Sequence, residues 1–278
     1  MYIINKISHF FDKNMFTTKH SFIDKGTFGY VYKITVNNID YAIKILKENN
    51  INCINKNELS FAEKYIKEKH NHHNIVKYLS IGKVIEPTNL KIHKKTCIIM
   101  KYYVPLDKHL IHLKSNKLFS VNTIIDVLID IFTASKWLIN NFNLIHTDIK
   151  IDNILVDRET NNYVLSDFSI TEHSNRYYYC TNKFNYSGNI SMYPFYNCYY
   201  NKFVLYSIGV LLLNVMGIST DIITNMNKDN YINIINTAFD IANINDIYLI
   251  KILNLLIEYN YFIPSYMNYY IDKYEKSK

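Results

Sequence analysis

A change of hydrophobic pattern near Pro105 is the feature that most constrains the fold. From about Ser21 to Leu46, and again at IVKYLSIG and TCIIMKYY, short β-branched and aromatic runs occur, and NNID marks a turn between two of them, as in antiparallel strands. After Pro105 the pattern changes to long helical stretches such as VNTIIDVLIDIFTASKWLINNF. The sequence therefore predicts an α+β fold with a small antiparallel-sheet lobe over 1–103 and a larger, mainly helical lobe over 104–278.

One helix is expected among the strands of the first lobe, over residues 57–69. Its apolar residues Leu59, Ala62 and Ile66 recur at helical spacing, and charged residues lie between them. This pattern is typical of an amphipathic helix with one face against a core.

The composition supports a globular protein with a sizeable core. The chain has six glycines and four prolines among 278 residues, and 49% of its residues are hydrophobic, which excludes collagen and Gly/Pro-rich disorder. Four cysteines with no CxxC pair indicate neither a disulfide scaffold nor a zinc ribbon, so free thiols in a reducing compartment are expected.

Charge and hydropathy bear on location and partners. The net charge of +7 comes mainly from lysines spread along the chain, so nucleic acid is not favoured as a partner. The start, MYIINKISHFFDKN, does not resemble a signal peptide. The apolar run from Phe203 to Ile218 is shorter than the roughly 20 residues of a membrane span and contains Asn214. We therefore expect a buried core helix there, no membrane partner, and a cytoplasmic location, with the nucleus as an alternative.

Two features of the first lobe each allow two interpretations. Gly26 and Gly29 lie close together in IDKGTFGYVY, which indicates either a close approach to the main chain or an ordinary hairpin turn. Lys44 lies between Ile43 and Ile45 in a strand-like run, so it needs an anionic partner if its side chain is turned inward.

The most informative segment is LIHTDIKIDNILV, residues 144–156. It holds Asp148, Lys150 and Asn153 between apolar runs, which predicts a polar loop against a core. A carboxylate, an ammonium group and a carboxamide suit phosphoryl transfer, because they orient a hydroxyl, neutralise phosphate and help to hold Mg²⁺. Asp167 follows the strand-like run YVLSDF and is a second candidate oxygen ligand for a hard cation.

Together these motifs resemble the eukaryotic-type protein kinase family. IDKGTFGYVY is similar to its glycine-rich loop, YAIK to its strand-three lysine motif, HNIVKY to the start of its fourth strand, HTDIKIDN to its catalytic loop and DFS to its DFG motif. The motifs follow in the family's order. The resemblance implies a two-lobed kinase domain over about 22–270, ATP and Mg²⁺ as cofactors, and protein substrates with Ser/Thr acceptors.

The resemblance assigns roles by position. Asp148 would be the catalytic base, Lys150 the γ-phosphate contact, and Asn153 with Asp167 the Mg²⁺ ligands. Lys44 would bind the α- and β-phosphates, and its partner would be Glu63, whose spacing to Val76 is usual for the family; Glu58 and Glu68 are the competitors. Further positions would contact the nucleotide, Met100 at the back of the adenine pocket and 101–103 as the hinge: Ile23, Gly26, Thr27, Phe28, Gly29, Val31, Ala42, Lys44, Met100, Lys101, Tyr103 and Leu155.

Four departures from the family pattern keep alternatives open. Asp24 replaces a loop glycine, Thr147 the arginine before the catalytic base, Ser169 the DFG glycine and Val204 a helical aspartate. An active Ser/Thr kinase is the leading hypothesis, with activation by loop phosphorylation not expected. A pseudokinase or nucleotide-binding scaffold is the first alternative and a small-molecule kinase the second. The high content of residues with A/T-rich codons, the short length and the divergent C-terminal motifs resemble those of kinases of large DNA viruses of insects, such as baculoviruses or entomopoxviruses. A viral origin would place the protein in the host-cell cytoplasm. Substrate identity and oligomeric state are not specified by the sequence.

Overall fold

The chain forms two compact units in a computed structural model, which describes residues 2–3, 20–25, 29–47, 54–87, 92–174, 177–178, 194, 198–227 and 229–257. The first unit consists of 1–103 together with 166–169, and the second of 104–165 with 170–278. Residues 166–169 therefore join the first unit, whereas a single division after Tyr103 would place them in the second. They do so because Phe168, fully buried, stacks on Phe61 with ring centroids 4.3 Å apart.

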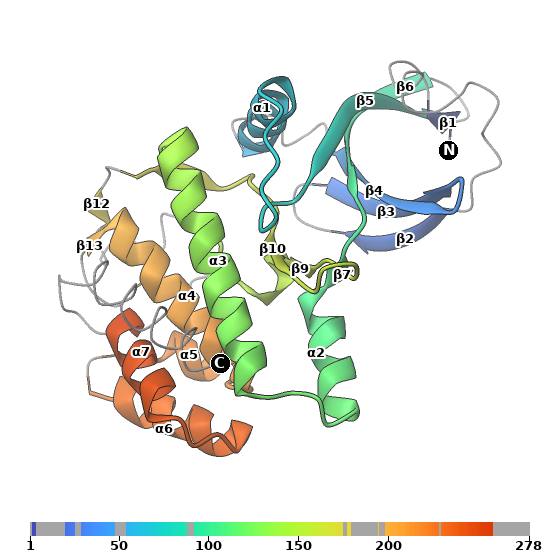
Figure 1. Ribbon diagram of the computed structural model, residues 1–278. Coiled ribbons are helices and arrows are strands. Elements are labelled where there is room, and N and C mark those ends of the chain that lie inside the picture. Colours follow the sequence, from blue (N-terminus) through green and yellow to red (C-terminus); the bar gives the residue numbers. More distant parts are fainter. Residues whose placement is uncertain are drawn as a thin grey trace. The chain divides into compact units, whose positions relative to one another are not determined.

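The first unit is an antiparallel sheet with one helix, α1 (Ile54–Lys67). Its strands lie in the order β1-β5-β6-β4-β3-β2. In chain order they are β1 (Tyr2–Ile3), β2 (His20–Lys25), β3 (Gly29–Val36), β4 (Ile39–Leu46), β5 (Tyr78–Pro87) and β6 (Ile92–Lys101) (Figure 1).

The β3–β4 hairpin turns at the NNID signal. Asn37 and Asn38 are the two connecting residues, and both have positive φ, 51° and 62°. Positive φ at both positions is the geometry of a type I′ turn, and asparagine tolerates it better than most residues do. The turn therefore sets the register that pairs Val31 with Lys44.

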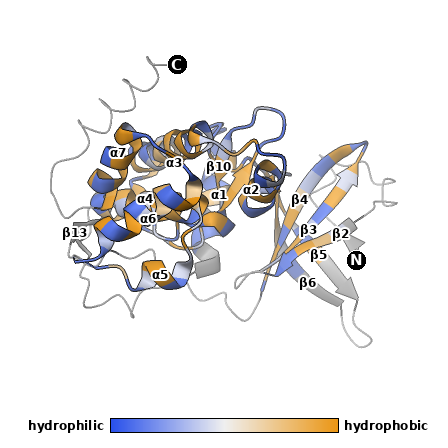
Figure 2. Ribbon diagram, turned by 90° about the horizontal axis from the view of Figure 1, so that it is seen from below, coloured by the Kyte–Doolittle hydropathy of each residue, from blue (hydrophilic) through white to orange (hydrophobic). Residues whose placement is uncertain are grey.

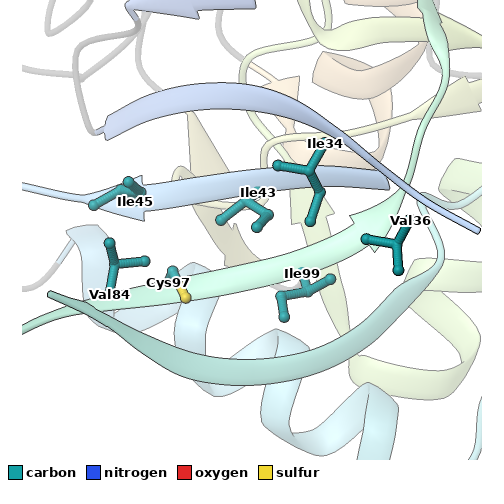
Figure 3. Close-up of a cluster of buried hydrophobic side chains, with 7 residues drawn as sticks. All are labelled: Ile34, Val36, Ile43, Ile45, Val84, Cys97 and Ile99. Carbon is teal, nitrogen blue, oxygen red and sulfur yellow. The ribbon is translucent and has the colours of Figure 1, made fainter. Parts of the chain in front are cut away.

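The side chains of strand β4 alternate between an apolar face of the sheet and the face that carries Lys44. Ile43 and Ile45 are fully buried in a cluster with residues of β3, β5 and β6, and Figure 3 shows this cluster as Ile34, Val36, Ile43, Ile45, Val84, Cys97 and Ile99. Because side chains alternate along a strand, Lys44 points to the opposite face.

Helix α1 packs a different face from the one expected from Leu59, Ala62 and Ile66. Ala62 is buried, but Leu59 and Ile66 are only half-buried. The buried residues are Glu58, Phe61, Ala62 and Tyr65. This face combines aromatic residues with one acidic residue, so the spacing of aliphatic residues alone does not identify it.

The second unit is mainly helical. Its helices are α2 (Leu106–Ser115), α3 (Val121–Phe142), the short 3₁₀ helix η3 (Ile151–Asn153), α4 (Tyr200–Met216), α5 (Thr220–Thr224), α6 (Tyr231–Ala242) and α7 (Ile247–Ile257). Its short strands are β7 (Val104–Pro105), β8 (Leu144–His146), β9 (Ile154–Val156), β10 (Tyr163–Leu165), β11 (Thr171–His173), β12 (Tyr177–Tyr178) and β13 (Cys198–Tyr199). The expected fold class, an antiparallel sheet with one helix plus a mainly helical lobe, is confirmed.

Two long helices form the core of the second unit. Helix α3 begins after Ser120, where Ser120 and Thr123 form a capping box, and it ends at Asn143 in the left-handed conformation. Helix α4 packs against α3 and α7 and is almost entirely buried, and Figure 2 shows apolar and polar faces on the helices around it. The apolar run expected to be a core helix is therefore one. Among the described residues no helix is long and apolar enough to cross a membrane.

Helices α4 and α7 approach closely at Gly209. A Cβ atom at this position would lie 2.8 Å from Cγ1 of Ile257 and 3.0 Å from Cβ of Leu256. Nearby, Lys202 Nζ donates hydrogen bonds to the carbonyl oxygens of Leu255 (2.9 Å) and Leu256 (3.2 Å). A cation on the last carbonyls of a helix is favourable, so Lys202 stabilises the end of α7 on which the long apolar helix rests.

Candidate active site

In the first unit, Lys44 lies between two carboxylates. Its Nζ is 2.6 Å from Oε2 of Glu58 on α1 and 2.9 Å from Oδ1 of Asp167. The side chain of Lys44 is 8% exposed and that of Glu58 is 1% exposed, whereas that of Asp167 is 30% exposed. An ammonium group this deeply buried needs ionic partners, and only Asp167 of the two has substantial access to solvent.

The prediction that Glu63 pairs with Lys44 is wrong, and the partner is Glu58. Glu63 is exposed. Two positions five residues apart on an α-helix point in directions that differ by roughly 140°, so these glutamates cannot share a face. Spacing counted along the chain does not determine helical phase. The buried positions Phe61, Ala62 and Tyr65 do determine it, and they share a face with Glu58.

Burial and charge act in opposite directions on this ion pair. Burial alone lowers the pKa of the Lys44 ammonium, but Glu58 and Asp167 outweigh that effect, and its pKa is raised above the ordinary value. Burial also raises the pKa of Glu58 to about 7; Lys44 opposes this rise, and the Asp167 carboxylate adds to it. Lys44 therefore stays a cation, while Glu58 ionises near neutral pH.

The nucleotide-binding positions predicted on the sheet lie on neighbouring strands. Val31 pairs with Lys44, and Ala42 with Met100, in the register of β3, β4 and β6. Ala42 and Met100 are buried and Val31 is half-buried. The ladder thus places them beside the lysine in one sheet.

The predicted hinge, residues 101–103, is held by two hydrogen bonds where it follows β6. The N–H of Lys101 donates to the carbonyl oxygen of Lys77 (3.1 Å), and the N–H of Lys77 donates to the Tyr103 hydroxyl (3.2 Å). Tyr103 is buried and Lys101 half-buried. These two bonds hold both ends of 101–103 against the start of β5.

The glycine-rich loop is described only at its ends. Gly26, Thr27 and Phe28 lie outside the described residues. Ile23 is half-buried at a register shift between β2 and β3. Gly29 is buried in β3, and a Cβ there would lie 2.6 Å from the carbonyl oxygen of Ile45, so the β3–β4 pairing has room only for glycine.

In the second unit, the loop between β8 and β9 gathers Asp148, Lys150 and Asn153. Lys150 Nζ lies 2.9 Å from Oδ2 of Asp148, and Asn153 Nδ2 donates to the same oxygen at 3.0 Å. Asn153 Nδ2 also donates to the backbone oxygen of Asp148 at 2.7 Å. Asp148 and Asn153 are each 6% exposed. Of the three side chains predicted for phosphoryl transfer, Lys150 and Asn153 therefore converge on the buried carboxylate of the third, Asp148. Leu155, predicted to contact the nucleotide, lies half-buried in β9 and pairs with Pro105.

Two further residues position this loop, and sequence reasoning gave neither of them this role. His146 is fully buried, and its Nδ1 accepts a hydrogen bond from the Asp148 N–H at 3.1 Å. Thr147 is 2% exposed, and both its N–H and its Oγ1 donate to the carbonyl oxygen of Ile170 at 3.2 Å. The sequence signal for these two roles was a histidine and a threonine directly before Asp148, in a segment that apolar runs flank on both sides. Thr147 thus holds the chain by hydrogen bonds at the position where the family pattern has an arginine.

Two other departures from the family pattern have clear structural settings. Asp24 is exposed in β2, and its Oδ1 accepts the N–H of Lys25 at 2.7 Å. Val204 is 3% exposed in α4, so this position provides an apolar contact and no carboxylate.

Comparison with known proteins agrees with this geometry. The model of the protein kinase domain matches residues 17–266. The chain belongs to the protein kinase family. The serine/threonine-protein kinase STY17 of Arabidopsis thaliana is 31% identical over 132 residues, covering 48% of this chain and 21% of that protein. A second Arabidopsis thaliana kinase, STY46, is 30% identical over 148 residues, covering 53% and 24%. A probable serine/threonine-protein kinase of Dictyostelium discoideum is 31% identical over 166 residues, covering 55% and 14%. The kinase chain thus spans a quarter or less of each of these relatives.

The oxygen donors of the kinase suit a hard divalent cation. Asp167 offers a partly exposed carboxylate. The amide nitrogen of Asn153 is directed at Asp148, which turns its amide oxygen the other way. Carboxylate and carboxamide oxygens are the ligand types that Mg²⁺ takes in proteins, so the donor chemistry of Asn153 and Asp167 fits the family's metal.

Proposed function

We propose that this protein kinase is an active, ATP- and Mg²⁺-dependent serine/threonine kinase that phosphorylates protein substrates. The observation that carries the proposal is the convergence of Lys150 and Asn153 on the buried Asp148 carboxylate. Such a carboxylate, held by a cation and an amide, is arranged to accept a proton from a hydroxyl group. A Ser/Thr acceptor is favoured because Lys150 follows the base in the pattern of Ser/Thr kinases, and because the relatives are named as such.

The proposed roles are those that the kinase resemblance implies, and the contacts within each unit support them. Asp148 accepts the proton of the acceptor hydroxyl, and Lys150 neutralises charge on the transferred phosphoryl group. Lys44, held by Glu58 and Asp167, contacts the α- and β-phosphates. The bound Mg²⁺, with Asn153 and Asp167 as its proposed ligands, supplies further neutralisation of phosphate charge.

A pseudokinase is the second candidate, and it rests on Asp24, Thr147, Ser169 and Val204. The structural surroundings of Asp24 and Thr147 weaken this alternative. The Asp24 carboxylate is exposed and bonded to its own neighbour, so solvent screens it from a nucleotide. Thr147 provides hydrogen bonds that fix the loop. The residues proposed to touch phosphate, metal and acceptor are all present.

Acceptor preference and nucleotide binding together test the proposal. We expect ATP with Mg²⁺ to raise the melting temperature, and we expect phosphoryl transfer to protein Ser/Thr but not to small alcohols such as choline or aminoglycosides. Transfer to a small alcohol alone would assign the protein to small-molecule kinases. Absence of both nucleotide stabilisation and transfer would favour a scaffold. The resemblance to kinases of insect DNA viruses and the cytoplasmic location stay predictions.

A further inference from the structure

Ser169, in the position of the usual glycine after Asp167 and Phe168, makes a specific contact in the first unit. Its hydroxyl donates to Oδ1 of Asp167 at 2.6 Å. Lys44 Nζ donates to the same oxygen at 2.9 Å. Ser169 is 1% exposed, while the Asp167 side chain is 30% exposed. A buried hydroxyl therefore holds a carboxylate that is itself partly exposed to solvent.

The backbone of the same segment is held by one face of α1. Asn57 Nδ2 contacts the carbonyl oxygen of Ser169 at 3.4 Å, and Phe61 stacks on Phe168. Glu58, which lies between them on the helix, shares Lys44 with Asp167. Each residue of 167–169 thus has a contact to α1 or to the lysine that α1 holds.

The Asp167 backbone needs such support. Its φ is 60°, in the left-handed region that residues other than glycine rarely adopt. A residue in this conformation persists only when its surroundings hold it there. The Ser169 hydroxyl adds a charge-assisted hydrogen bond to the side chain of this residue, and such bonds are stronger than neutral ones.

We propose that Ser169 is a positioning residue for the metal-binding carboxylate. The inference rests on the proposed function. Two donors, the Ser169 hydroxyl and the Lys44 ammonium, fix Oδ1 and therefore the orientation of the carboxylate that would bind a divalent cation. Glycine at this position gives backbone freedom and no hydroxyl. In this chain serine replaces that freedom with a bond, which pre-organises Asp167 for Mg²⁺.

Two variants separate the hydroxyl from the backbone. Ser169→Ala removes only the hydroxyl, while Ser169→Gly also frees the backbone. Ser169→Thr keeps the hydroxyl and serves as the rescue. Ser135→Ala is the matched control, because Ser135 is also buried, at 4% exposure, but its hydroxyl donates within its own helix, to the carbonyl oxygen of Ile131.

The readout is binding, not turnover. The melting temperature of the full chain is measured with saturating ADP while Mg²⁺ is increased, and with ADP and EDTA alone. For Ser169→Ala we expect about a tenfold rise in the Mg²⁺ concentration that gives half of the stabilisation, as for loss of a hydrogen bond to a charged group. ADP binding without Mg²⁺ should change less than about twofold, because the hydroxyl acts through the metal ligand. Ser169→Thr should restore the wild-type Mg²⁺ response, and Ser135→Ala should not alter it.

Each other outcome overturns the inference in an identifiable way. A wild-type Mg²⁺ response in Ser169→Ala means that the hydroxyl does not position the carboxylate. An equal loss of ADP binding with and without Mg²⁺ means that the role is merely structural. If Ser169→Ala does not fold, Ser169→Gly replaces it, because this variant also lacks the hydroxyl, and a wild-type Mg²⁺ response there again overturns the proposal. A wild-type protein whose stability does not respond to Mg²⁺ with ADP contradicts the proposed function itself.

Discussion

Replacing Glu58 by glutamine separates what the Lys44–Glu58 pair does for activity from what it does for stability. Glutamine keeps an oxygen that accepts from Lys44 Nζ, but it cannot ionise. Burial raises the pKa of Glu58 to about 7 from an ordinary 4.5. The groups that face this carboxylate are Lys44, Asp167 and Tyr78. Glu63, exposed on the same helix, is the matched control.

The sign of the stability effect follows from the direction of the shift. The folded protein binds this proton more tightly than the unfolded chain does. The contribution of Glu58 to stability is therefore fully present below about pH 4.5 and is lost as the pH rises through about 7. At ~1.4 kcal/mol per pKa unit, wild type should lose about 2–3 kcal/mol of unfolding free energy relative to Glu58→Gln between about pH 5 and pH 8.

Thermal unfolding and turnover, measured side by side, check this expectation. Between pH 5 and pH 8 the melting temperature of wild type should fall by a few degrees relative to that of Glu58→Gln, and the turnover of Glu58→Gln should be lower than that of wild type, because the charge pair that orients Lys44 is gone. Glu63→Gln should match wild type in both measurements, to within about 0.5 kcal/mol in stability. The reasoning is refuted if Glu63→Gln loses turnover while Glu58→Gln keeps it. It is also refuted if the unfolding free energies of wild type and Glu58→Gln change in parallel between pH 5 and pH 8.

Four further expectations concern individual residues and phosphorylation. Asp148→Asn should abolish phosphoryl transfer and leave nucleotide binding largely intact, as measured by turnover and by melting shift, because the base contacts the acceptor and not ATP; wild-type turnover would show that the loop is wrongly assigned. Thr147→Val removes one of two hydrogen bonds to Ile170 and should lower the free energy of unfolding by about 1 kcal/mol, as measured by thermal unfolding. Phosphatase treatment should leave wild-type turnover unchanged, because activation by loop phosphorylation is not expected. A loss of turnover after this treatment would contradict that expectation. Gly29→Ala places a Cβ 2.6 Å from the Ile45 carbonyl oxygen and should destabilise the protein by about 1–3 kcal/mol, whereas unchanged stability would mean that the β3–β4 ladder adjusts freely.

Features encoded in local pattern were predictable from the sequence. The turn residues Asn37 and Asn38 define the hairpin that carries Lys44. The period of α3 gives its bounds, with Ser120 and Asn143 at its ends. The polar loop around Asp148 was recognisable because apolar runs frame it on both sides. Each of these depends on neighbours in the chain.

Features that depend on packing between distant segments were not predictable. Glu58 and Glu63 are both acidic residues on one helix, and only the packing of Phe61 and Tyr65 decides which of them faces Lys44. Likewise, Ser169 read as a loss of glycine, because the hydrogen bond to Asp167 exists only in the folded left-handed turn. Distance along the chain fixes neither helical phase nor the partner of a hydroxyl.

Transfer of the γ-phosphate of ATP to protein tests the central claim most directly. Wild type, Lys44→Met and Asp148→Asn are incubated with labelled ATP, Mg²⁺, and a basic or a casein-like acidic protein. We predict labelled Ser or Thr with wild type and none with either variant, because Lys44 holds phosphate and Asp148 accepts the hydroxyl proton. Labelling that persists in both variants, or that never occurs with a folded wild type, would contradict the assignment.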